Sequence, residues 1–331
     1  MAAPNRVTIR DVARAASVST TTVSDAINGR GRLPESTRAR VIEVAATLGY
    51  AASPLAQNLR RGRTGAVALY FPHNTLSMKY YIDLAIGAAE EALAHNLALV
   101  LLPALGTSTV FPVQVDGVVV SDPMLGDPML ARVRRLGVPV VTCEADLTPG
   151  AASDGVIESD HRTAMGELLD HLFAEGARRV ALVCTADNTA FAQQIRQGYR
   201  DWMHKTQAPQ LLWSIPFVST QSEITAALHE ILAVRPSVDA IISVPDGSVT
   251  TALQVVSAAG LRVPEDILLA SYVDSPELSG LPTPVTAVDL SARTMGRRAS
   301  ELLANLIAGR VQAGSRQRLT ARLVIRASTR R

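Results

Sequence analysis

Hydroxyl side chains near the start of the chain are the residues best suited to chemistry on a partner molecule. The run Ser19-Thr20-Thr21-Thr22-Val23-Ser24 places Thr20, Thr21 and Ser24 near the start of an expected helix. Threonine and serine can contact base edges in the major groove of DNA through the hydroxyl group, or through the methyl group with thymine. Such contacts discriminate weakly between bases, so these residues predict DNA recognition with modest sequence specificity.

Charge is divided unequally along the chain. Residues 1–63 contain ten arginines, no lysine and four acidic residues, a net charge of +6, so the rest of the chain carries −4. A basic head on an acidic body is typical of a head that binds a polyphosphate. A basic patch alone is more often a solvated surface. The helix pattern in residues 1–63 is what favours binding of a polyphosphate by this patch.

Two short helices are expected to hold these side chains. Thr8 followed three residues later by Asp11 has the form of a capping box that starts a helix, and the apolar residues at 9, 12, 13 and 16 fall on one face. Ser17-Val18-Ser19 forms the turn, and Ser19 can cap a second helix over residues 20–28. The sequence therefore predicts two helices joined by a tight turn.

A third helix is expected to brace this pair. Pro34 suits its first position and Gly49 would end it, while its buried face would consist of Val41, Val44, Ala45 and Leu48. Three helices in this order predict a helix-turn-helix head over residues 1–50.

The runs VTIRDVA (7–13) and VSTTTVS (18–24), then Asn28, Thr37-Arg38 and Leu48-Gly49-Tyr50, resemble the LacI/GalR family of bacterial transcription regulators. The similarity continues through nearly all of the chain. It implies that Thr8, Ser19, Asn28, Thr37 and Tyr50 hold phosphates, which sets the register on DNA without reading sequence. The DNA contacts expected in all are Thr8, Ser19, Thr20, Thr21, Thr22, Ser24, Asn28, Arg30, Arg32, Thr37, Tyr50, Asn58, Leu59 and Arg60.

Residues 51–63 form an expected linker with a short helix, which Ser53 can cap. The segment is too short to be a stable helix alone, so it is expected to fold only with a partner. It resembles the hinge helix of the family, in which a leucine from each of two subunits opens a base step in the minor groove. Leu59 occupies the matching position. The alternative is an ordinary flexible linker.

From Gly65 onward, short apolar runs alternate with amphipathic stretches. The strand-like runs are 66–70, 97–102, 115–120, 138–143, 180–184, 240–244, 267–272 and 323–325, and the helical patterns lie around 78–95, 128–136, 160–176, 190–205, 221–234, 248–260 and 291–308. This alternation predicts parallel sheets covered by helices on both faces. The expected fold is an all-α helix-turn-helix head followed by an α/β core.

By resemblance, the core over residues 64–331 is like a periplasmic binding protein, with two doubly wound parallel-sheet lobes. The chain is expected to cross between the lobes near 157, 289 and 316. Lobe 1 would then comprise about 64–157 and 290–315, and lobe 2 about 158–289 and 316–331. Residues 103–114 contain two prolines and a glycine and barely suffice for a crossover, so the helix usual in the family is expected to be missing there.

The resemblance also implies a small-molecule effector in the cleft between the lobes, at the carboxyl ends of strands. The expected effector-binding residues are His73, Tyr80, Tyr81, Glu144, Phe191, Arg196, Asp246 and Asp274. Ile195 stands where the family often has an effector-gripping arginine, with Arg196 beside it. Other polar anchors of the family are also replaced here, so either the ligand is unusual or the cleft has lost its ligand.

Other functional classes find little support in the sequence. There is no G-x-S-x-G, Walker or H-E-x-x-H motif, so an enzyme is not expected, and neither a cofactor nor a metal is expected. The two cysteines, Cys143 and Cys184, are expected to be buried thiols. Asp160 is expected to cap a helix, and the arginine-rich tail 326–331 is expected to be solvated.

The sequence therefore predicts a DNA-binding transcriptional regulator, most simply a repressor, that binds a pseudo-palindromic operator as a homodimer. Without an apolar signal segment or a membrane span, it is expected in the cytoplasm. The alternative is a sugar-like small-molecule binding protein without a DNA function, against which the basic head argues.

Overall fold

The computed structural model describes residues 7–27, 29, 31–50, 62–71, 78–102, 113–186, 188–216 and 219–331. The chain divides into two compact units, Met1–Gly65 and Ala66–Arg331. The predicted hinge, residues 51–63, lies almost entirely outside the described residues, as does most of segment 103–114. None of the helices in the described part of the chain has the length and apolar character that crossing a bilayer requires.

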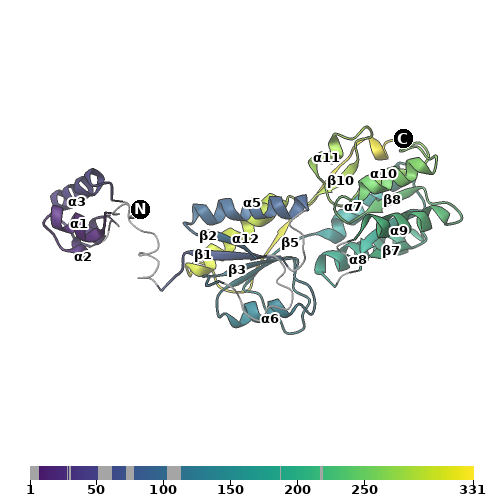
Figure 1. Cartoon of the computed structure of the whole chain (residues 1–331). Coiled ribbons are helices and arrows are strands. Elements are labelled where there is room, and N and C mark those ends of the chain that lie inside the picture. The colour runs from purple at the N-terminus through teal and green to yellow at the C-terminus, as the bar shows by residue number, and fades with distance from the viewer. Residues whose placement is uncertain are drawn as a thin grey trace. The chain divides into compact units, whose positions relative to one another are not determined.

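The first unit is a three-helix head made of α1 (Ile9–Ala15), α2 (Thr20–Ile27) and α3 (Glu35–Thr47) (Figure 1). The capping box is confirmed, because the Thr8 backbone N–H donates to Asp11 Oδ2 at 2.9 Å. The Thr22 N–H donates to Ser19 Oγ at 3.0 Å, so Ser19 caps α2 as expected. The core of the head gathers buried residues from all three helices, among them Val12, Val23 and Val41.

Helix α3 ends at the predicted glycine but differs from the prediction at its start and in the burial of Leu48. Pro34 is its N-cap residue rather than its first helical residue. Gly49 has φ +66° and the Tyr50 N–H donates to Ala45 O at 2.8 Å, which is the expected glycine-terminated end. Leu48, expected in the core, is 37% exposed because the chain has already begun to leave the helix there.

The first lobe is built on a parallel six-stranded sheet with strand order β11-β5-β4-β3-β1-β2. Its strands are β1 (Ala66–Tyr70), β2 (Ala98–Leu102), β3 (Val118–Ser121), β4 (Val140–Cys143), β5 (Gly155–Ser159) and β11 (Ser315–Leu319). Helices α5 (Lys79–Ala94) and α12 (Ala292–Ile307) cover one face, and α6 (Pro128–Arg135) covers the other. Central strands buried on both faces read as continuous apolar runs, which is why β1, β3 and β4 were predictable.

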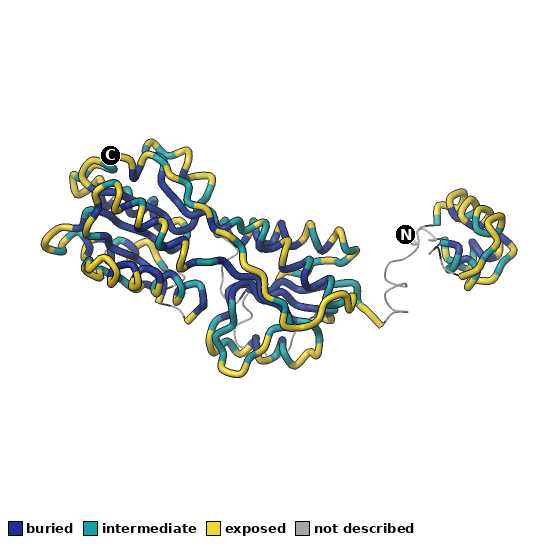
Figure 2. The backbone as a smooth tube through the Cα atoms, turned by 180° about the vertical axis from the view of Figure 1, so that it is seen from behind, coloured by how far each residue is buried: buried dark blue, intermediate teal, exposed yellow. Residues whose placement is uncertain are grey.

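The second lobe repeats the plan with strand order β12-β10-β9-β8-β6-β7, in which only β12 runs antiparallel to its neighbour. Its strands are β6 (Val180–Thr185), β7 (Leu211–Ile215), β8 (Ala240–Ser243), β9 (Leu268–Ser271), β10 (Thr286–Asp289) and β12 (Arg322–Val324). Its helices are α7 (His161–Ala174), α8 (Ala190–Thr206), α9 (Gln221–Ala233), α10 (Ser248–Ala258), α11 (Pro276–Ser279) and the 3₁₀ turn η1 (Ala327–Thr329). Figure 2 shows both sheets as buried strands beneath more exposed helices. The predicted fold class is confirmed.

Three crossings join the lobes, after β5, after β10 and after β11. The first and third come later than the expected positions 157 and 316, because β5 runs to Ser159 and β11 to Leu319 within the first sheet. Asp160 starts the first crossing and caps α7, since its Oδ1 accepts the Thr163 N–H at 3.1 Å. Both cysteines are buried thiols rather than members of a disulfide, as expected.

The expectation of a solvated tail at 326–331 is wrong. Ser328 and Thr329 are fully buried. The Ser328 hydroxyl donates to Leu269 O at 2.6 Å and accepts the Thr286 N–H at 2.9 Å. The small hydroxyl residues within the tail thus satisfy backbone groups of β9 and β10, a role that the surrounding arginines conceal in the sequence.

Candidate functional sites

The outward face of α2 carries the side chains predicted to read bases. Thr20 and Thr21 are exposed, whereas Val23 and Ala26 on the opposite face are buried in the head. Thr22 and Ser24 are half-buried at the edges of this face. A helix that is anchored on one side and presents small hydroxyl residues on the other has the form of a recognition helix.

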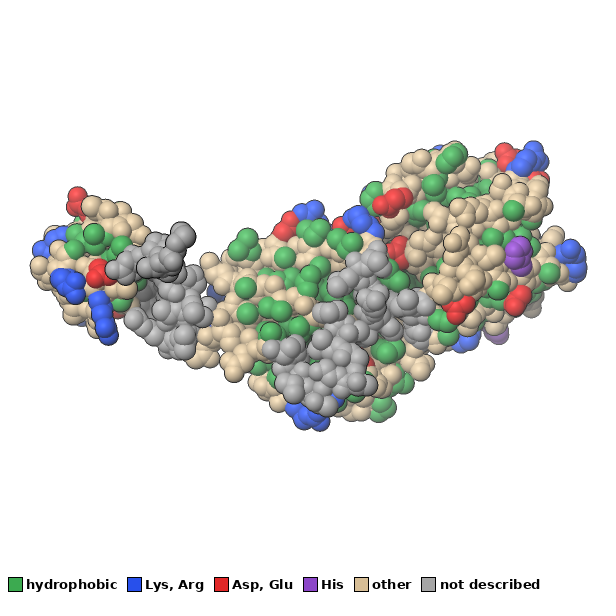
Figure 3. Space-filling model, viewed as in Figure 1, with side chains coloured by type: hydrophobic (Ala, Val, Ile, Leu, Met, Phe, Trp, Pro, Cys, Tyr) green, Lys and Arg blue, Asp and Glu red, His purple; other side chains and the backbone are tan. Residues whose placement is uncertain are grey.

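The expected phosphate-contacting residues lie around α2 on the same unit. Thr8, Ser19 and Arg32 are exposed, and Thr37 and Tyr50 are half-buried. The Thr8 and Ser19 hydroxyls also serve as caps, so their roles in folding and in binding overlap. Figure 3 shows arginine side chains, in blue, on this unit. The predicted contacts Asn28, Arg30, Asn58, Leu59 and Arg60 lie outside the described residues.

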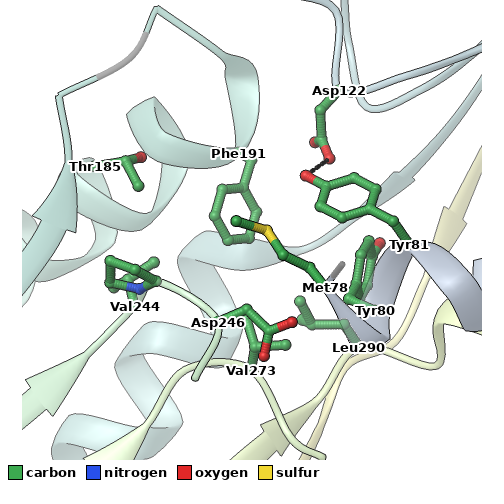
Figure 4. Close-up of a pocket in the computed structure, with 11 residues that line it drawn as sticks. Met78, Tyr80, Tyr81, Asp122, Thr185, Phe191, Val244, Asp246, Val273 and Leu290 are labelled. Carbon is green, nitrogen blue, oxygen red and sulfur yellow. Dashed lines mark hydrogen bonds between the residues drawn. The ribbon is translucent and has the colours of Figure 1, made fainter. Parts of the chain in front are cut away.

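A cavity lies between the two lobes, at the carboxyl ends of strands from both sheets (Figure 4). The first lobe contributes the start of α5 and the end of β3, and the second lobe contributes the ends of β6, β8 and β9 and the start of α8. The described residues that line it are Met78, Tyr80, Tyr81, Asp122, Thr185, Phe191, Val244, Pro245, Asp246, Val273 and Leu290. Four of the eight predicted effector residues, Tyr80, Tyr81, Phe191 and Asp246, are therefore brought together here.

Asp122 and Tyr81 form a buried acid–phenol pair in the cavity wall. The Tyr81 hydroxyl donates to Asp122 Oδ2 at 2.7 Å. Burial, together with the nearby charge of Glu144, raises the pKa of Asp122 from its ordinary 3.8 to about 7. Burial also raises the pKa of the Tyr81 phenol well above its ordinary value, so this phenol remains a hydrogen-bond donor at neutral pH.

Glu144 and His161 lie directly beside this pair and are almost fully buried. Glu144 Oε1 accepts the Ser159 N–H at 3.0 Å. His161 Nε2 lies 3.1 Å from the same oxygen without meeting the geometry of a hydrogen bond, and His161 Nδ1 is 3.2 Å from the Tyr272 hydroxyl. Among the described residues, Glu144 Oε2 has no hydrogen-bond partner.

Asp122 and Glu144 both adopt left-handed backbone conformations, with φ of +45° and +71°. Such conformations are uncommon for residues other than glycine and often accompany functional sites. Each residue directly follows an adjacent strand, β3 or β4, where the chain turns away from the sheet.

Asp246 joins the two lobes across the cavity. It follows β8 in the second lobe, and its carboxyl group is directed toward backbone N–H groups of Tyr80 and Lys79 at the start of α5 in the first lobe. Burial raises the pKa of Asp246, and these N–H groups partly oppose the increase. An acid at a helix N-terminus is favourably placed, because the unpaired N–H groups there carry partial positive charge.

Asp274 does not line this cavity, and its predicted effector role stays a prediction. Both of its carboxylate oxygens accept hydrogen bonds from Arg326 at 2.8 Å, so this carboxylate is already paired with an arginine of the C-terminal segment. Arg196 is half-buried on α8 and does not line the cavity, and its Nε and Nη2 atoms have no partner among the described residues. Its predicted role stays untested, and His73 lies outside the described residues.

Sequence reasoning missed Met78, Asp122 and His161. Asp122 directly follows an apolar run and could have been found as a polar residue at the carboxyl end of a parallel strand. His161 was passed over because Asp160 explained the helix start. Met78 carries no sequence signal, since a methionine before a helix is ordinary.

Two family models match the chain. One described as "Bacterial regulatory proteins, lacI family" matches residues 8–53, and one described as "Periplasmic binding protein-like domain" matches residues 169–329. The HTH-type transcriptional regulator CelR of Thermobifida fusca is 28% identical, over 98% of each chain. The HTH-type transcriptional regulator Rv3575c of Mycobacterium tuberculosis is 29% identical, over 90% of each chain.

Solved structures show the same architecture. A CelR–cellobiose complex covers 98% of this chain and 100% of that one, with a TM-score of 0.73 and 27% identity. A lac repressor dimer bound to operator and the anti-inducer ONPF covers 99% of this chain and 100% of that one, with a TM-score of 0.81. At 21% identity, the second likeness shows the fold alone.

A helix-turn-helix head followed by a two-lobed α/β body defines a class of DNA-binding regulators. The chain carries the helix-turn-helix domain of the LacI family of bacterial regulatory proteins, followed by a periplasmic-binding-protein-like domain. Its function is DNA-binding regulation of transcription, and the family consists of regulators rather than enzymes.

Proposed function

We propose that this regulator is a repressor that binds a pseudo-palindromic operator as a homodimer and is controlled by a small molecule in the inter-lobe cavity. The observation that carries the proposal is that residues of both lobes, such as Tyr80 and Asp246, form the walls of one cavity. A ligand there contacts both lobes at once, so it favours one lobe arrangement over others by its differential affinity. The CelR–cellobiose complex supports a small organic ligand in such a protein.

The proposed DNA contacts are those predicted from the sequence, with Thr20 and Thr21 reading bases and Arg32 on phosphate. Their exposure on the head supports this assignment. We propose residues 1–50 as the DNA-binding domain, 51–63 as the hinge with Leu59 as its wedge, and the rest as the effector-binding and dimerisation core. The cytoplasm is the proposed location, since the DNA target lies there.

The proposed dimer contact involves the first lobe. On α5, Ile82, Ile86 and Leu93 are 39%, 42% and 74% exposed, and Leu101 on the neighbouring edge strand β2 is 45% exposed. Exposed apolar residues gathered on one surface mark interaction sites. Sedimentation of the wild type as a dimer and of Ile86→Lys as a monomer would support this contact, whereas a monomeric wild type would contradict it.

The experiment that tests the function is a gel shift of the purified protein on the DNA upstream of its own gene. We expect a specific complex that competitor DNA of scrambled sequence does not displace, and a weaker complex for Thr21→Ala. The same substitution in α3, Thr47→Ala, serves as the control because the Thr47 hydroxyl donates to Glu43 O within that helix. A wild-type protein that binds both DNAs equally would overturn the proposal.

The second candidate is a regulator whose cavity has lost its ligand. It is favoured by the size of the cavity, about 30 Å³, which is room for roughly two water molecules. Reporter repression that no metabolite changes, with specific DNA binding intact, would favour this candidate.

A further inference from the structure

The cavity walls combine aromatic rings with carboxyl groups. Tyr80, Tyr81 and Phe191 line it, and the rings of Tyr80 and Tyr81 meet edge to face with centroids 5.2 Å apart. Asp122 and Asp246 line it from opposite lobes (Figure 4). None of the described lining residues is a lysine or an arginine, so the walls offer acceptors and π-faces but no cation.

Two cations close to these walls are engaged by acids, whereas Arg196 of α8 does not line the cavity and has Nε and Nη2 without a partner among the described residues. Lys79, in the first turn of α5, forms an ion pair with Asp83. Arg326 makes a bidentate pair with Asp274 and donates to Val285 O. The carboxyl groups of the cavity walls are therefore met by hydrogen-bond donors, the Tyr81 hydroxyl on Asp122 and the N–H groups of Tyr80 and Lys79 on Asp246, and not by a lysine or an arginine of the described lining.

Glu144 supplies a second, independent observation. It is 3% exposed, and its Oε2 atom is buried without a hydrogen-bond partner among the described residues. Its charge raises the pKa of both Asp122 and Tyr80, so it lies close enough to act on these two cavity residues. Its other oxygen, Oε1, accepts the Ser159 N–H and lies 3.1 Å from His161 Nε2, so Oε2 is the oxygen left without a partner. A buried carboxylate oxygen without a partner is costly, and a cation brought close to it reduces that cost.

Met78 occupies the centre of the site. Figure 4 shows its thioether side chain extending between Phe191 and the two tyrosine rings. The remaining cavity, about 30 Å³, is small. Methionine has three rotatable bonds and fills irregular gaps adaptably, so a compact ligand can take its place when this side chain turns away.

We infer that the ligand of this cavity is a small organic cation, with an ammonium group held by Asp122 and Asp246 and a compact apolar body packed on Tyr80, Tyr81 and Phe191. This inference rests on the proposed function, because it assigns the ligand class of the same effector cavity. Aromatic faces attract cations, and charge-assisted hydrogen bonds to carboxylates are stronger than neutral ones. An ammonium group stabilises the ionised form of these carboxyl groups, which burial disfavours, whereas a neutral sugar offers hydrogen bonds alone and an anion would be repelled.

Isothermal titration of the full-length protein with three compounds of one skeleton tests the inference. Benzylamine is the cation, benzyl alcohol the neutral analogue and benzoate the anion, and D-glucose represents neutral sugars. We expect benzylamine to bind at least about tenfold more tightly than any of the other three. Equal or tighter binding of benzyl alcohol, benzoate or glucose would overturn the inference, as would the absence of binding by benzylamine at millimolar concentrations.

Two variants locate the contact. Asp122→Asn keeps an acceptor for the Tyr81 hydroxyl and removes the charge, and Asp246→Asn does the same on the other lobe. In each variant the dissociation constant of benzylamine should come to within about threefold of that of benzyl alcohol, and the dissociation constant of benzyl alcohol itself should not change. Asp266→Asn is the matched control, because Asp266 pairs with Arg262 just before β9, at the edge of the sheet away from the cavity. An ammonium preference that survives in both cavity variants would contradict the assignment.

Operator binding, measured in the same preparations, separates the two proposals. A protein that binds operator DNA and shows no ammonium preference retains the proposed function and loses this inference. A protein that prefers ammonium and does not bind operator DNA retains the inference and loses the proposed function.

Discussion

The buried carboxyl group of Asp122 has a higher pKa than an aspartate on the surface. Its pKa is raised to about 7 first by burial and then by Glu144, while the Tyr81 hydroxyl and His161 act in the opposite direction. The unfolded chain exposes the same group to water, where it titrates near 3.8. Between these two pH values, the folded protein holds a proton that the unfolded chain has released.

The contribution of Asp122 to stability should therefore fall as pH rises from about 4 to about 7, since the folded state holds this proton and the unfolded chain does not. Replacing Asp122 by asparagine removes this loss. The unfolding free energy of Asp122→Asn minus that of the wild type should therefore increase by on the order of 3 kcal/mol from pH 4 to pH 8. Urea unfolding at a series of pH values measures it.

The groups that act on the pKa of Asp122 are Tyr81 from α5, Glu144 after β4 and His161 from α7, and Tyr80 and Cys143 also lie within reach of its charge. Asp266→Asn provides the control, because Arg262 lowers the pKa of Asp266 and places its effect below pH 4. A difference between wild type and Asp122→Asn that stays constant from pH 4 to pH 8 would contradict the raised pKa.

At the scale of elements, α5 and α12 pack closely because each presents a glycine to the other. A Cβ atom on Gly296 would lie 2.0 Å from Leu84 O, and one on Gly87 would lie 2.0 Å from Arg293 O. These atoms belong to the backbone, so no side-chain rotation can make room. The two helices form the main cover over one face of the first sheet.

Gly296→Ala should destabilise the protein by about 1–3 kcal/mol, because overpacking outweighs the gain of about 1 kcal/mol in helix propensity. Gly166→Ala in α7 is the matched control, since a Cβ atom there meets nothing within 4 Å. That variant should be more stable than the wild type by up to about 1 kcal/mol. Thermal melts of both variants decide the matter, and equal shifts would show that the helices can separate freely.

The predictable elements were those with a continuous apolar run or a clear helical period. The sequence pattern did not predict four strands, β5, β7, β10 and β11, and the reasons are physical. β11, with the sequence SRQRL, is an exposed edge strand whose polar residues give no apolar pattern. β5 buries Glu158, whose carboxylate pairs with Arg316 of β11, so an acid stands where an apolar residue was expected.

The cavity was predictable in part for the same kind of reason. Aromatic residues at the start of α5 and α8 and the acid after β8 follow from the topology, since parallel strands end at one edge. The capture of Asp274 by Arg326 could not be foreseen, because it depends on a tail 52 residues away in sequence.

For the whole molecule, the separation of charge between head and body governs DNA affinity. The ten arginines of residues 1–63 release counterions when they neutralise phosphates, so the logarithm of affinity should fall steeply and linearly with the logarithm of salt concentration. Arg32→Ala should reduce the slope by about 1 for each subunit and weaken binding on all sequences alike. Fluorescence anisotropy at several salt concentrations measures both. Arg310→Ala, an exposed arginine of the body, should leave the slope unchanged, and a flat wild-type line would exclude an electrostatic origin.

The crossings between the lobes determine when each lobe can be completed during synthesis. The second sheet obtains five of its six strands from one stretch of chain, β6 to β10, before the chain returns to the first lobe. The first lobe cannot be completed until α12 and β11 have been synthesised, and β11 ends at Leu319. A nascent chain therefore carries the apolar face of α5 uncovered while more than half of the protein is still being translated, a period in which aggregation is the main hazard. Ribosome-bound chains arrested before residue 292 should depend on chaperones at the first lobe, although its sequence was made first.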